Sequence, residues 1–251
     1  MLENFSNDVK LFMIFDILGD TVRSGPIQWK IERERLEDVK NHVFDLITIT
    51  RILKKYFPDI LDYNKINDYI LCHDLPEAIT GDITKFEGVS DDEIKRVTDL
   101  AIDYLATKFN DVMDLKTILN NYEEKVDIES KVVKMIDKVH SATTFIKYQS
   151  EYDIDMNNPK IDKILRYHPF VVEKIADGKD LADIFFEFHI KAVDISLEEC
   201  EKYGISKEDA NKIVNAIKGF AYEFYNQKLN GTLLDVKQDF PVDAMKYNRN
   251  R

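Results

Sequence analysis

Apolar residues recur along most of the chain with the three- and four-residue spacing of helices. The clearest stretch covers residues 39–57, which follow Glu37 and Asp38 and end before Pro58. Acidic residues favour a helix start, and proline ends a helix. The same spacing predicts helices at residues 9–18, 66–74, 91–110, 115–122, 127–148, 180–200 and 207–229.

Two details refine this pattern. Residues 9–18 are apolar on nearly all sides, which predicts a buried helix. Asp91 and Asp92 are expected to cap the helix that follows them, and residues 19–26 are expected to break the chain between helices. No stretch alternates apolar and polar residues as a half-buried strand would. The pattern therefore predicts an all-α protein.

Composition supports a packed helical domain. The chain has 251 residues, of which 44% are hydrophobic and 33% charged, and it contains only 8 glycines and 6 prolines. A core of this size excludes a wholly disordered chain, and the shortage of turn residues disfavours many short strands.

Charge and cysteine content narrow the class of function. The formal net charge is −12, which excludes the basic footprint of a protein that binds nucleic acid polymers. An anionic substrate would need a local cation to offset this field. Two cysteines are too few for a disulfide framework. The longest apolar stretch, residues 11–18, is far shorter than the ~20 residues that a membrane span needs. We expect a soluble, cytoplasmic protein without a membrane partner.

Four residues form a candidate metal-binding set. His73 and Asp74 are adjacent, and imidazole and carboxylate groups are ligands for divalent ions. The pair alone is a weak signal, because it arises often by chance as a core histidine beside a surface aspartate. His42 lies in the first turn of the helix predicted at 39–57. Asp137 lies in the middle of the helix predicted at 127–148, at the edge of its apolar face, where a buried carboxylate needs a partner.

The order His42, His73-Asp74, Asp137 resembles the HD-domain metal-dependent phosphohydrolase superfamily. Residues 73–83 read His-Asp-Leu-Pro-Glu-Ala-Ile-Thr-Gly-Asp-Ile, which is similar to the branch that contains bacterial 5′-deoxynucleotidases. In that branch a Glu follows the HD pair by three residues, and a Thr-Gly-Asp lies further along. The branch usually has Glu before and Ser after its first histidine, whereas Asn and Val flank His42. The resemblance extends over residues 10 to about 150.

The resemblance implies one divalent ion, Mn²⁺, Co²⁺, Zn²⁺ or Mg²⁺, bound by His42, His73, Asp74 and Asp137. Such an ion lowers the pKa of water, polarises phosphorus and supplies a local positive charge. Glu77 is the expected acid/base, and Asp82 either shares this role or holds a nucleoside sugar. Each also fits a solvated turn residue. His140, three residues after Asp137, is expected to be a core residue or to support a ligand rather than to bind the ion.

Other residues are candidates for binding the substrate. Arg33 and Arg35 precede the His42 helix, and arginine can grip phosphate with two donors at once. Trp29, the only tryptophan, lies upstream of the first histidine, where the resembling branch has a Trp. It is expected to stack on a sugar or base, or else to anchor its loop. Lys85, after the Thr-Gly-Asp turn, is a further phosphate candidate.

These interpretations predict a single HD-type helical bundle over residues 1–251, with a core at about 10–150, extra C-terminal helices at about 151–235 and a polar tail at 236–251. The expected reaction is hydrolysis of (deoxy)nucleoside 5′-monophosphates to nucleoside and phosphate, in a homodimer or higher homo-oligomer. Two alternatives stay open. One is a deoxynucleoside triphosphate hydrolase that releases tripolyphosphate, and the other is a nucleotide-sensing or interaction protein with a degenerate site.

Overall fold

The described part of the chain is built from helices. The computed structural model describes residues 6–27, 36–84, 88–151, 177–178 and 181–229. Within these ranges no strand forms, and the single β feature is an isolated bridge between Val22 and Asp38. The predicted all-α class is therefore confirmed.

The helices have the following bounds in chain order. They are α1 (Ser6–Ile17), α2 (Ser24–Ile27), α3 (Val39–Leu53), the 3-10 helix η3 (Lys54–Tyr56), α4 (Tyr63–Cys72), α5 (Glu77–Thr80), α6 (Asp91–Phe109), α7 (Leu115–Glu124), α8 (Ile128–Glu151), α11 (Leu181–Lys191), α12 (Leu197–Tyr203) and α13 (Lys207–Leu229).

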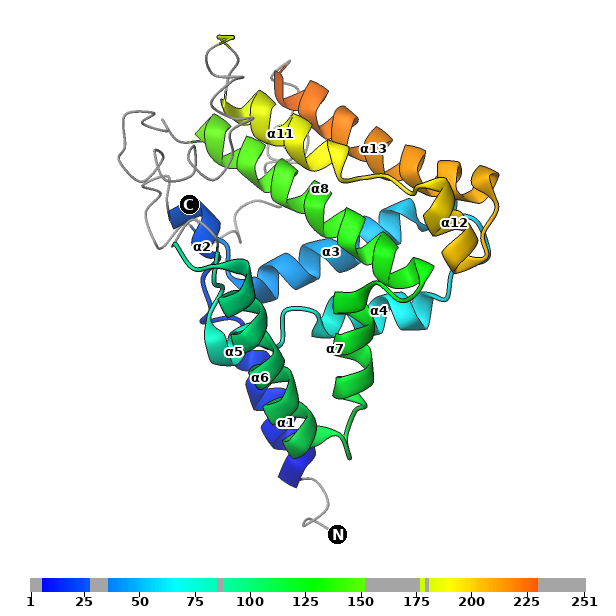
Figure 1. The fold of residues 1–251 in the computed structure, drawn as a ribbon. Coiled ribbons are helices and arrows are strands. Elements are labelled where there is room, and N and C mark those ends of the chain that lie inside the picture. Colours follow the sequence, from blue (N-terminus) through cyan, green and yellow to red (C-terminus); the bar gives the residue numbers. More distant parts are fainter. Residues whose placement is uncertain (1–5, 28–35, 85–87, 152–176, 179–180, 230–251) are drawn as a thin grey trace, which may run out of the picture.

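Helix α8 is the centre of the main core. Figure 1 shows α11 and α13 along one side of α8 and α3 and α4 along the other. Buried side chains from all of these helices form one continuous cluster, which includes Leu46, Ile66, Ile136, Ile190 and Ile213. The C-terminal helices thus complete the core around α8 and hold it in place.

A second cluster lies at the other end of the molecule, where α1, α6 and α7 pack together. Its buried members include Leu11, Leu105 and Leu119. Ile70 belongs to the first cluster, whereas Cys72 and Leu75, on either side of the His73-Asp74 pair, belong to the second. The pair therefore lies just after the point where the chain passes from one core to the other.

Side-chain caps fix where the central helices begin. Asp38 caps α3 by accepting a hydrogen bond from the backbone N–H of Asn41. Asp62 caps α4, and its own backbone N–H donates to the carboxylate of Glu129 on α8. A cap of this kind contributes about 1 kcal/mol. These contacts set the start of α3, which carries His42, and tie α4 to α8.

The cap of α6 differs from the prediction. Ser90 accepts a hydrogen bond from the backbone N–H of Glu93, whereas Asp91 and Asp92 occupy the first turn. The break predicted at residues 19–26 also contains the start of the short helix α2 at Ser24.

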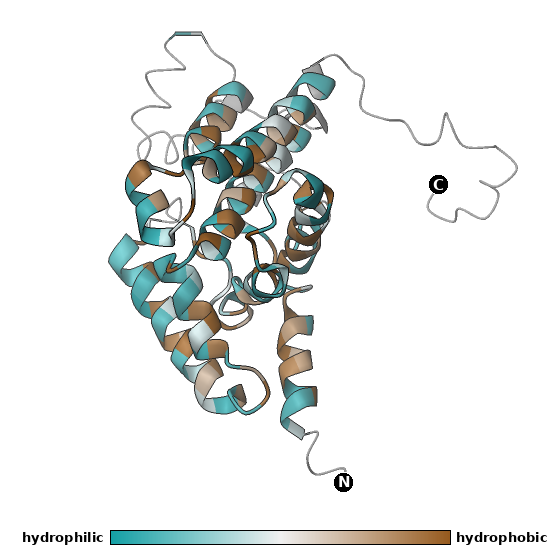
Figure 2. Cartoon of the chain, turned by 90° about the vertical axis from the view of Figure 1, so that its right-hand side faces the viewer, coloured by the Kyte–Doolittle hydropathy of each residue, from teal (hydrophilic) through white to brown (hydrophobic). Residues whose placement is uncertain are grey.

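The prediction of a buried helix at residues 9–18 is wrong. Helix α1 packs through Leu11 against one side of the molecule, while Val9, Phe12 and Met13 are 55%, 68% and 59% exposed. Figure 2 shows apolar residues along much of this helix, which follows the N-terminus. The cause is that α1 lies at the edge of the second cluster, so neighbouring helices cover only one of its two apolar faces.

The single helix predicted at residues 180–200 is also wrong, because the chain forms α11 and α12 with a break between them. Ser196 and Glu199 form a capping box that starts α12. In this motif the serine and glutamate side chains each bond the backbone N–H of the other residue, which favours a new helix start. Val193 is fully buried within the break, so the connection belongs to the core.

Among the described helices, none combines the length and the hydropathy that crossing a lipid bilayer requires. The division of the chain into a core, a C-terminal extension and a tail stays a prediction.

Replacing Ile217 tests whether the C-terminal helices stabilise the whole fold. Ile217 is fully buried in the main cluster. Ile217→Ala should lower the free energy of unfolding by about 2–5 kcal/mol, through lost burial and the cavity left behind. Urea unfolding followed by circular dichroism measures this. Leu197→Ala is the matched control, because Leu197 is 63% exposed and its loss should change stability by less than about 0.5 kcal/mol. Equal effects of the two variants would contradict this account of the core.

Candidate metal centre

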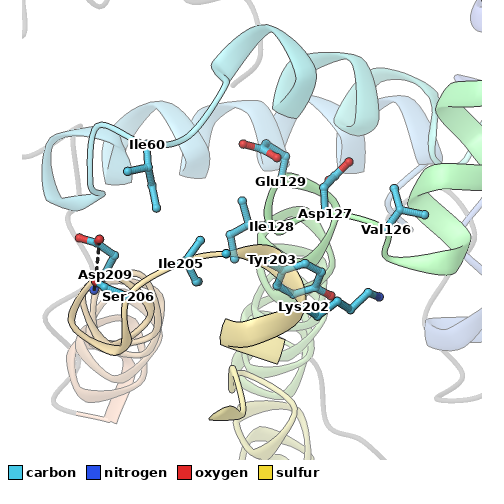
Figure 3. Close-up of a pocket in the computed structure, with 11 residues that line it drawn as sticks. Ile60, Val126, Asp127, Ile128, Glu129, Lys202, Tyr203, Ile205, Ser206 and Asp209 are labelled. Atoms are coloured by element: carbon cyan, nitrogen blue, oxygen red, sulfur yellow. Dashed lines mark hydrogen bonds between the residues drawn. The ribbon is translucent and has the colours of Figure 1, made fainter. Parts of the chain in front are cut away.

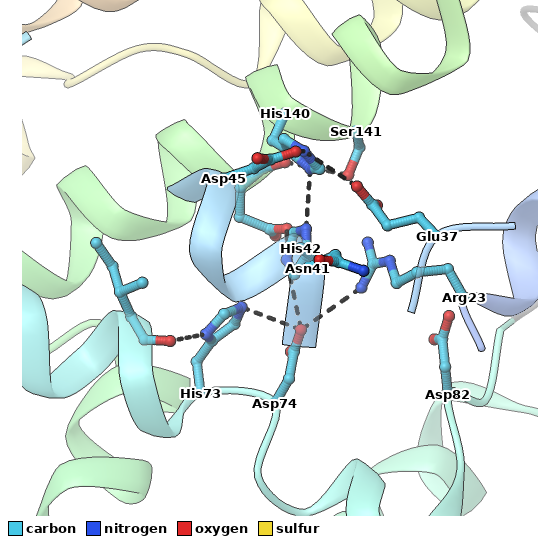
Figure 4. Close-up of polar contacts among 12 residues, drawn as sticks. Arg23, Glu37, Asn41, His42, Asp45, His73, Asp74, Asp82, His140 and Ser141 are labelled. Atoms are coloured by element: carbon cyan, nitrogen blue, oxygen red, sulfur yellow. Dashed lines mark hydrogen bonds and ion pairs between the residues drawn. The ribbon is translucent and has the colours of Figure 1, made fainter. Parts of the chain in front are cut away.

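Three helices bring the four predicted ligand residues together. His42 lies in the first turn of α3, His73 and Asp74 directly follow α4, and Asp137 lies within α8. The Nε2 atoms of His42 and His73 lie 3.4 and 3.1 Å from Oδ2 of Asp74. Nε2 of His42 also lies 3.5 Å from Oδ1 of Asp137. Figure 4 shows the two imidazoles and Asp74 facing one another.

The two histidines present unpartnered nitrogen atoms to this cluster. Nε2 of His42 and Nε2 of His73 are both buried and have no hydrogen-bond partner. The other ring nitrogen of His73, Nδ1, is 2.9 Å from the backbone oxygen of Ile70, so Nδ1–H donates and Nε2 is the atom left to bind a proton or a cation. Burial opposes the positive charge of His73, but Asp74 and Asp137 outweigh burial and raise its pKa. Burial lowers the pKa of His42 well below its usual value, which keeps that ring neutral.

This set of atoms fits a divalent cation. Ligand atoms of His42, His73 and Asp137 lie within 4.8 Å of one another, and Asp74 adds a second carboxylate. Neutral imidazole and carboxylate groups together suit Zn²⁺, Mn²⁺ and related ions. Leaving two buried nitrogen atoms without partners is costly, and a bound cation would satisfy both.

Arg23 supplies a cation that the sequence analysis did not identify. Its Nη1 is 3.5 Å from Oδ2 of Asp74, and its backbone N–H donates to the carbonyl of Glu37. Burial opposes the charge of Arg23, but Asp74, Asp82 and Glu77 outweigh burial and raise its pKa. The guanidinium is thus held as a fixed positive charge beside the carboxylates. In the sequence, the feature that could have drawn attention to Arg23 is its position directly before Ser24, Gly25 and Pro26.

Two lysines flank Asp137 on its own helix and were also missed. Nζ of Lys134 is 3.6 Å and Nζ of Lys138 is 3.9 Å from Oδ2 of Asp137. Burial alone would raise the pKa of Asp137, but the two lysines outweigh burial and lower it well below its usual value. Asp137 is therefore ionised and able to act as an anionic ligand. The signal in the sequence was lysine at positions −3 and +1 from Asp137.

Glu77 is half-buried beside the cluster, and its pKa is shifted in the opposite direction to that of Asp137. It begins α5, and its Oε2 atom is buried without a hydrogen-bond partner. Burial, together with the charges of Asp74 and Asp82, raises the pKa of Glu77 well above its usual value. A carboxyl group of this kind holds a proton to higher pH than a solvated one. Glu77 is thus not the solvated turn residue that was the alternative interpretation.

Asp82 is engaged with the segment that carries Arg23. Its Oδ2 accepts a hydrogen bond of 2.6 Å from the backbone N–H of Ser24, and the Ser24 hydroxyl donates to the backbone oxygen of Asp82. Burial raises the pKa of Asp82, although Arg23 and the Ser24 hydrogen bond oppose the shift. Asp82 therefore fixes residues 23 and 24 against the loop that follows α5. Figure 4 shows Asp82 on the far side of Arg23 from the histidines.

The four residues predicted to contact the substrate, Trp29, Arg33, Arg35 and Lys85, lie outside the described residues. The structure also has a pocket of about 420 Å³ elsewhere, where the turn before α8 meets α12 and the start of α13. Figure 3 shows Asp127, Glu129 and Lys202 among the side chains that line it. None of the four predicted ligand residues lines this pocket.

Comparison with known proteins identifies the family. The family model for the HD domain matches residues 15–175, which is more than half of the chain. The chain therefore belongs to the HD domain family, and the predicted superfamily is confirmed.

Individual relatives agree with this assignment. A 5′-deoxynucleotidase from Saccharomyces cerevisiae is 28% identical over 123 residues, which are 46% of this chain and only half (50%) of that protein's length. A conserved hypothetical protein from Pyrococcus furiosus has the same fold, with a TM-score of 0.54, 16% identity, and coverage of 87% of this chain and 99% of that chain. A predicted metal-dependent phosphohydrolase from Magnetospirillum magnetotacticum gives a TM-score of 0.55, 13% identity, and coverage of 91% and 95%.

The raised pKa of Glu77 predicts a specific dependence of stability on pH. Glu77 releases its proton near its ordinary pKa of 4.5 in the unfolded chain and at higher pH in the folded chain. Between these values the folded state binds more protons, so rising pH destabilises it, by about 1.4 kcal/mol for each unit of pKa difference. In the metal-free protein, Glu77→Gln should remove this loss. The variant should therefore gain stability over the wild type at pH 8 relative to pH 5.

Urea unfolding at the two pH values measures the difference. Glu198→Gln is the control, because Glu198 is exposed in the first turn of α12. Parallel pH profiles for Glu77→Gln and the wild type would refute the burial of an ionisable Glu77.

Proposed function

We propose that the chain is an HD-type metal-dependent phosphohydrolase that holds one divalent ion on His42, His73, Asp74 and Asp137. The observation that carries this proposal is the pair of buried, unpartnered Nε2 atoms of His42 and His73 beside two carboxylates. When bound, a cation at this position supplies Lewis-acid polarisation of a phosphoryl group and lowers the pKa of water. The protein's part is to hold the two imidazoles and the ionised carboxylates in place before the ion arrives.

Glu77 is proposed to move the proton in the reaction. Its raised pKa lets the carboxyl group take a proton from water and return it to the leaving oxygen near neutral pH. The contacts of Asp82 with Ser24 support a positioning role for Asp82 toward Arg23. The two roles predicted for Asp82, a share in proton transfer or a contact to a nucleoside sugar, remain the alternatives.

The phosphate group is proposed to bind between Arg23 and Lys138. Arg23 is a half-buried cation that can offer two donors to one phosphate. The side chain of Lys138 is 39% exposed and lies next to Asp137, whereas Arg23 lies next to Asp74. Together with the metal, these cations offset the formal charge of −12 where an anionic substrate would bind.

The proposed substrates are (deoxy)nucleoside 5′-monophosphates. Two observations support this class: the run of residues 73–83 resembles the 5′-deoxynucleotidase branch, and the yeast relative bears that name. Trp29, Arg33, Arg35 and Lys85 remain the proposed contacts to the rest of the nucleotide. Hydrolysis of deoxynucleoside triphosphates and nucleotide sensing by an inactive site are the alternatives, and the predicted homo-oligomer stays a prediction.

Two substitutions separate the role of ligand from that of acid/base. Asp137→Ala should lose both metal and activity, because the ion loses an anionic ligand. Glu77→Gln should keep the metal and lose about 10²–10⁴-fold in kcat, since that is the usual contribution of a general acid–base. Elemental analysis of the purified proteins, together with phosphate release, measures both properties. Two tightly bound ions per wild-type chain would contradict a mononuclear site, and loss of metal from Glu77→Gln would make Glu77 a ligand.

The products identify which phosphorus is attacked. With a deoxynucleoside 5′-monophosphate and Mn²⁺, Co²⁺, Mg²⁺ or Zn²⁺ we expect nucleoside and inorganic phosphate, with little turnover of the triphosphate. Chromatography of the products across a panel of nucleotides decides this. Tripolyphosphate from a triphosphate, with monophosphates left intact, would favour the triphosphate hydrolase. Stoichiometric nucleotide binding without turnover under every metal would favour the sensor.

A further inference from the structure

His42 makes a second contact on the side of its ring that faces away from Asp74. Its Nδ1 atom is 2.9 Å from Nδ1 of His140, and this contact is buried. The two rings have centroids 4.7 Å apart and are tilted by 59°. Figure 4 shows His140 above His42 and Asp74 below it, so the two residues lie on opposite sides of the His42 ring. His42 is thus held between a cluster of carboxylates and a second histidine.

The contact leaves open which histidine donates, because either Nδ1 can carry the proton. On the far side of His140, Nε2 lies 3.3 Å from Oδ2 of Asp45 and 3.5 Å from Oε1 of Glu37, so two carboxylates can accept a proton from this nitrogen. Nε2 of His42 faces Asp74 and Asp137 in a similar way, so the donor at the Nδ1 contact is decided by what occupies Nε2 of His42.

A cation at the proposed site would take the lone pair of Nε2 of His42. The proton of that ring must then be on Nδ1, which donates to Nδ1 of His140, and the proton of His140 lies on Nε2, between Asp45 and Glu37. The backbone oxygen of Ile70 accepts from Nδ1 of His73 in the same way and leaves Nε2 of His73 for the cation.

We propose that His140 is a positioning residue that selects the Nδ1–H tautomer of His42 and orients its ring, with Glu37 and Asp45 as its anchors. This inference rests on the proposed function only in that His42 binds the metal. The usual partner of a metal-binding histidine is a carboxylate, a backbone carbonyl or water. In this chain a second histidine takes that place and links the site to α3 through Asp45 and to the segment before α3 through Glu37.

Glu37 is itself held firmly enough to act as an anchor. Its backbone N–H donates to the hydroxyl of Tyr148 on α8, at 2.8 Å, and its carbonyl accepts from Arg23. His140 and Tyr148 lie two helical turns apart on α8, so one helix contacts both the backbone and the side chain of residue 37. The orientation of His42 and the placement of Arg23 therefore depend on the same residue.

Metal affinity of the full-length chain tests the proposal without reference to turnover. His140→Ala removes the acceptor, so affinity for Co²⁺ should fall about 10–100-fold in competition with a chromophoric chelator. His140→Asn places an amide oxygen near the position of Nδ1, so it should restore affinity to within a few-fold of wild type. His189→Ala is the matched control, because His189 lies on α11, which packs against α8 at another place. It should leave affinity unchanged.

Two results would overturn the inference. One is wild-type affinity in His140→Ala, and the other is an equal loss in His140→Asn and His140→Ala, which would reduce His140 to a packing role. Circular dichroism and the Tm of each metal-free variant show whether it is folded.

¹⁵N NMR of the imidazoles of the wild-type protein at pH 8, metal-free and with Zn²⁺, reports which ring nitrogen carries the proton and needs no substitution. With Zn²⁺ bound, we expect the Nε2–H tautomer for His140 and the Nδ1–H tautomer for His42. The Nδ1–H tautomer for His140 in the Zn²⁺-bound protein would refute the proposal. A wild-type chain that binds neither Co²⁺ nor Zn²⁺ would refute the proposed metal site, and this outcome is distinct from metal binding that is unchanged in His140→Ala.

Discussion

Balancing buried negative charge is the constraint on which the candidate site depends. Asp74, Asp137, Glu77 and Asp82 lie close enough for their charges to shift one another's pKa values. Burial disfavours every ionised carboxylate, so the site stays charged only where cations compensate. Asp137, with two lysines nearby, is ionised, whereas Glu77 lacks a comparable partner and has a raised pKa. Neighbouring charges thus keep Asp137 ionised and raise the pKa of Glu77, although the two carboxyl groups lie in the same site.

The packing of the helices determines where these charged residues lie. The start of α3, the end of α4 and the middle of α8 each contribute polar residues where the two apolar clusters meet. Ends of helices are suitable places for such residues, because the chain there can turn polar groups inward without breaking the apolar face of a helix. The middle of α8 is different. Its polar residues are tolerated there because α3, α4, α11 and α13 bury the apolar residues around them.

Sequence reasoning succeeded where the signal is local or carried by a motif. Periodicity predicted the helices around α3, α4, α7 and α8. Residue types and the resemblance together predicted that His42 and Asp137 belong with the His73-Asp74 pair. The structure brings these residues together, and their binding of a metal stays a proposal. Sequence reasoning failed for Arg23, because its partner Asp74 is 51 positions away and no nearby residue marks the contact. It failed for α1 because periodicity shows that a helix has apolar faces, but not how many of them neighbouring helices will cover. The break before α12 was predictable, since Ser196 and Glu199 have the spacing of a capping box.

The polar contacts around His42 also explain why a histidine at position 140, three residues after Asp137, can contact the His42 ring. Asp137 and His140 lie nearly one helical turn apart on α8, so they approach His42 from the same helix, at Nε2 and Nδ1 respectively. A shift of α8 along its axis would therefore displace both contacts together. The helices that pack on α8, including α11 and α13, limit such a shift. The C-terminal helices contribute to the site in this indirect way, by holding in register the one helix that contacts both nitrogen atoms of His42.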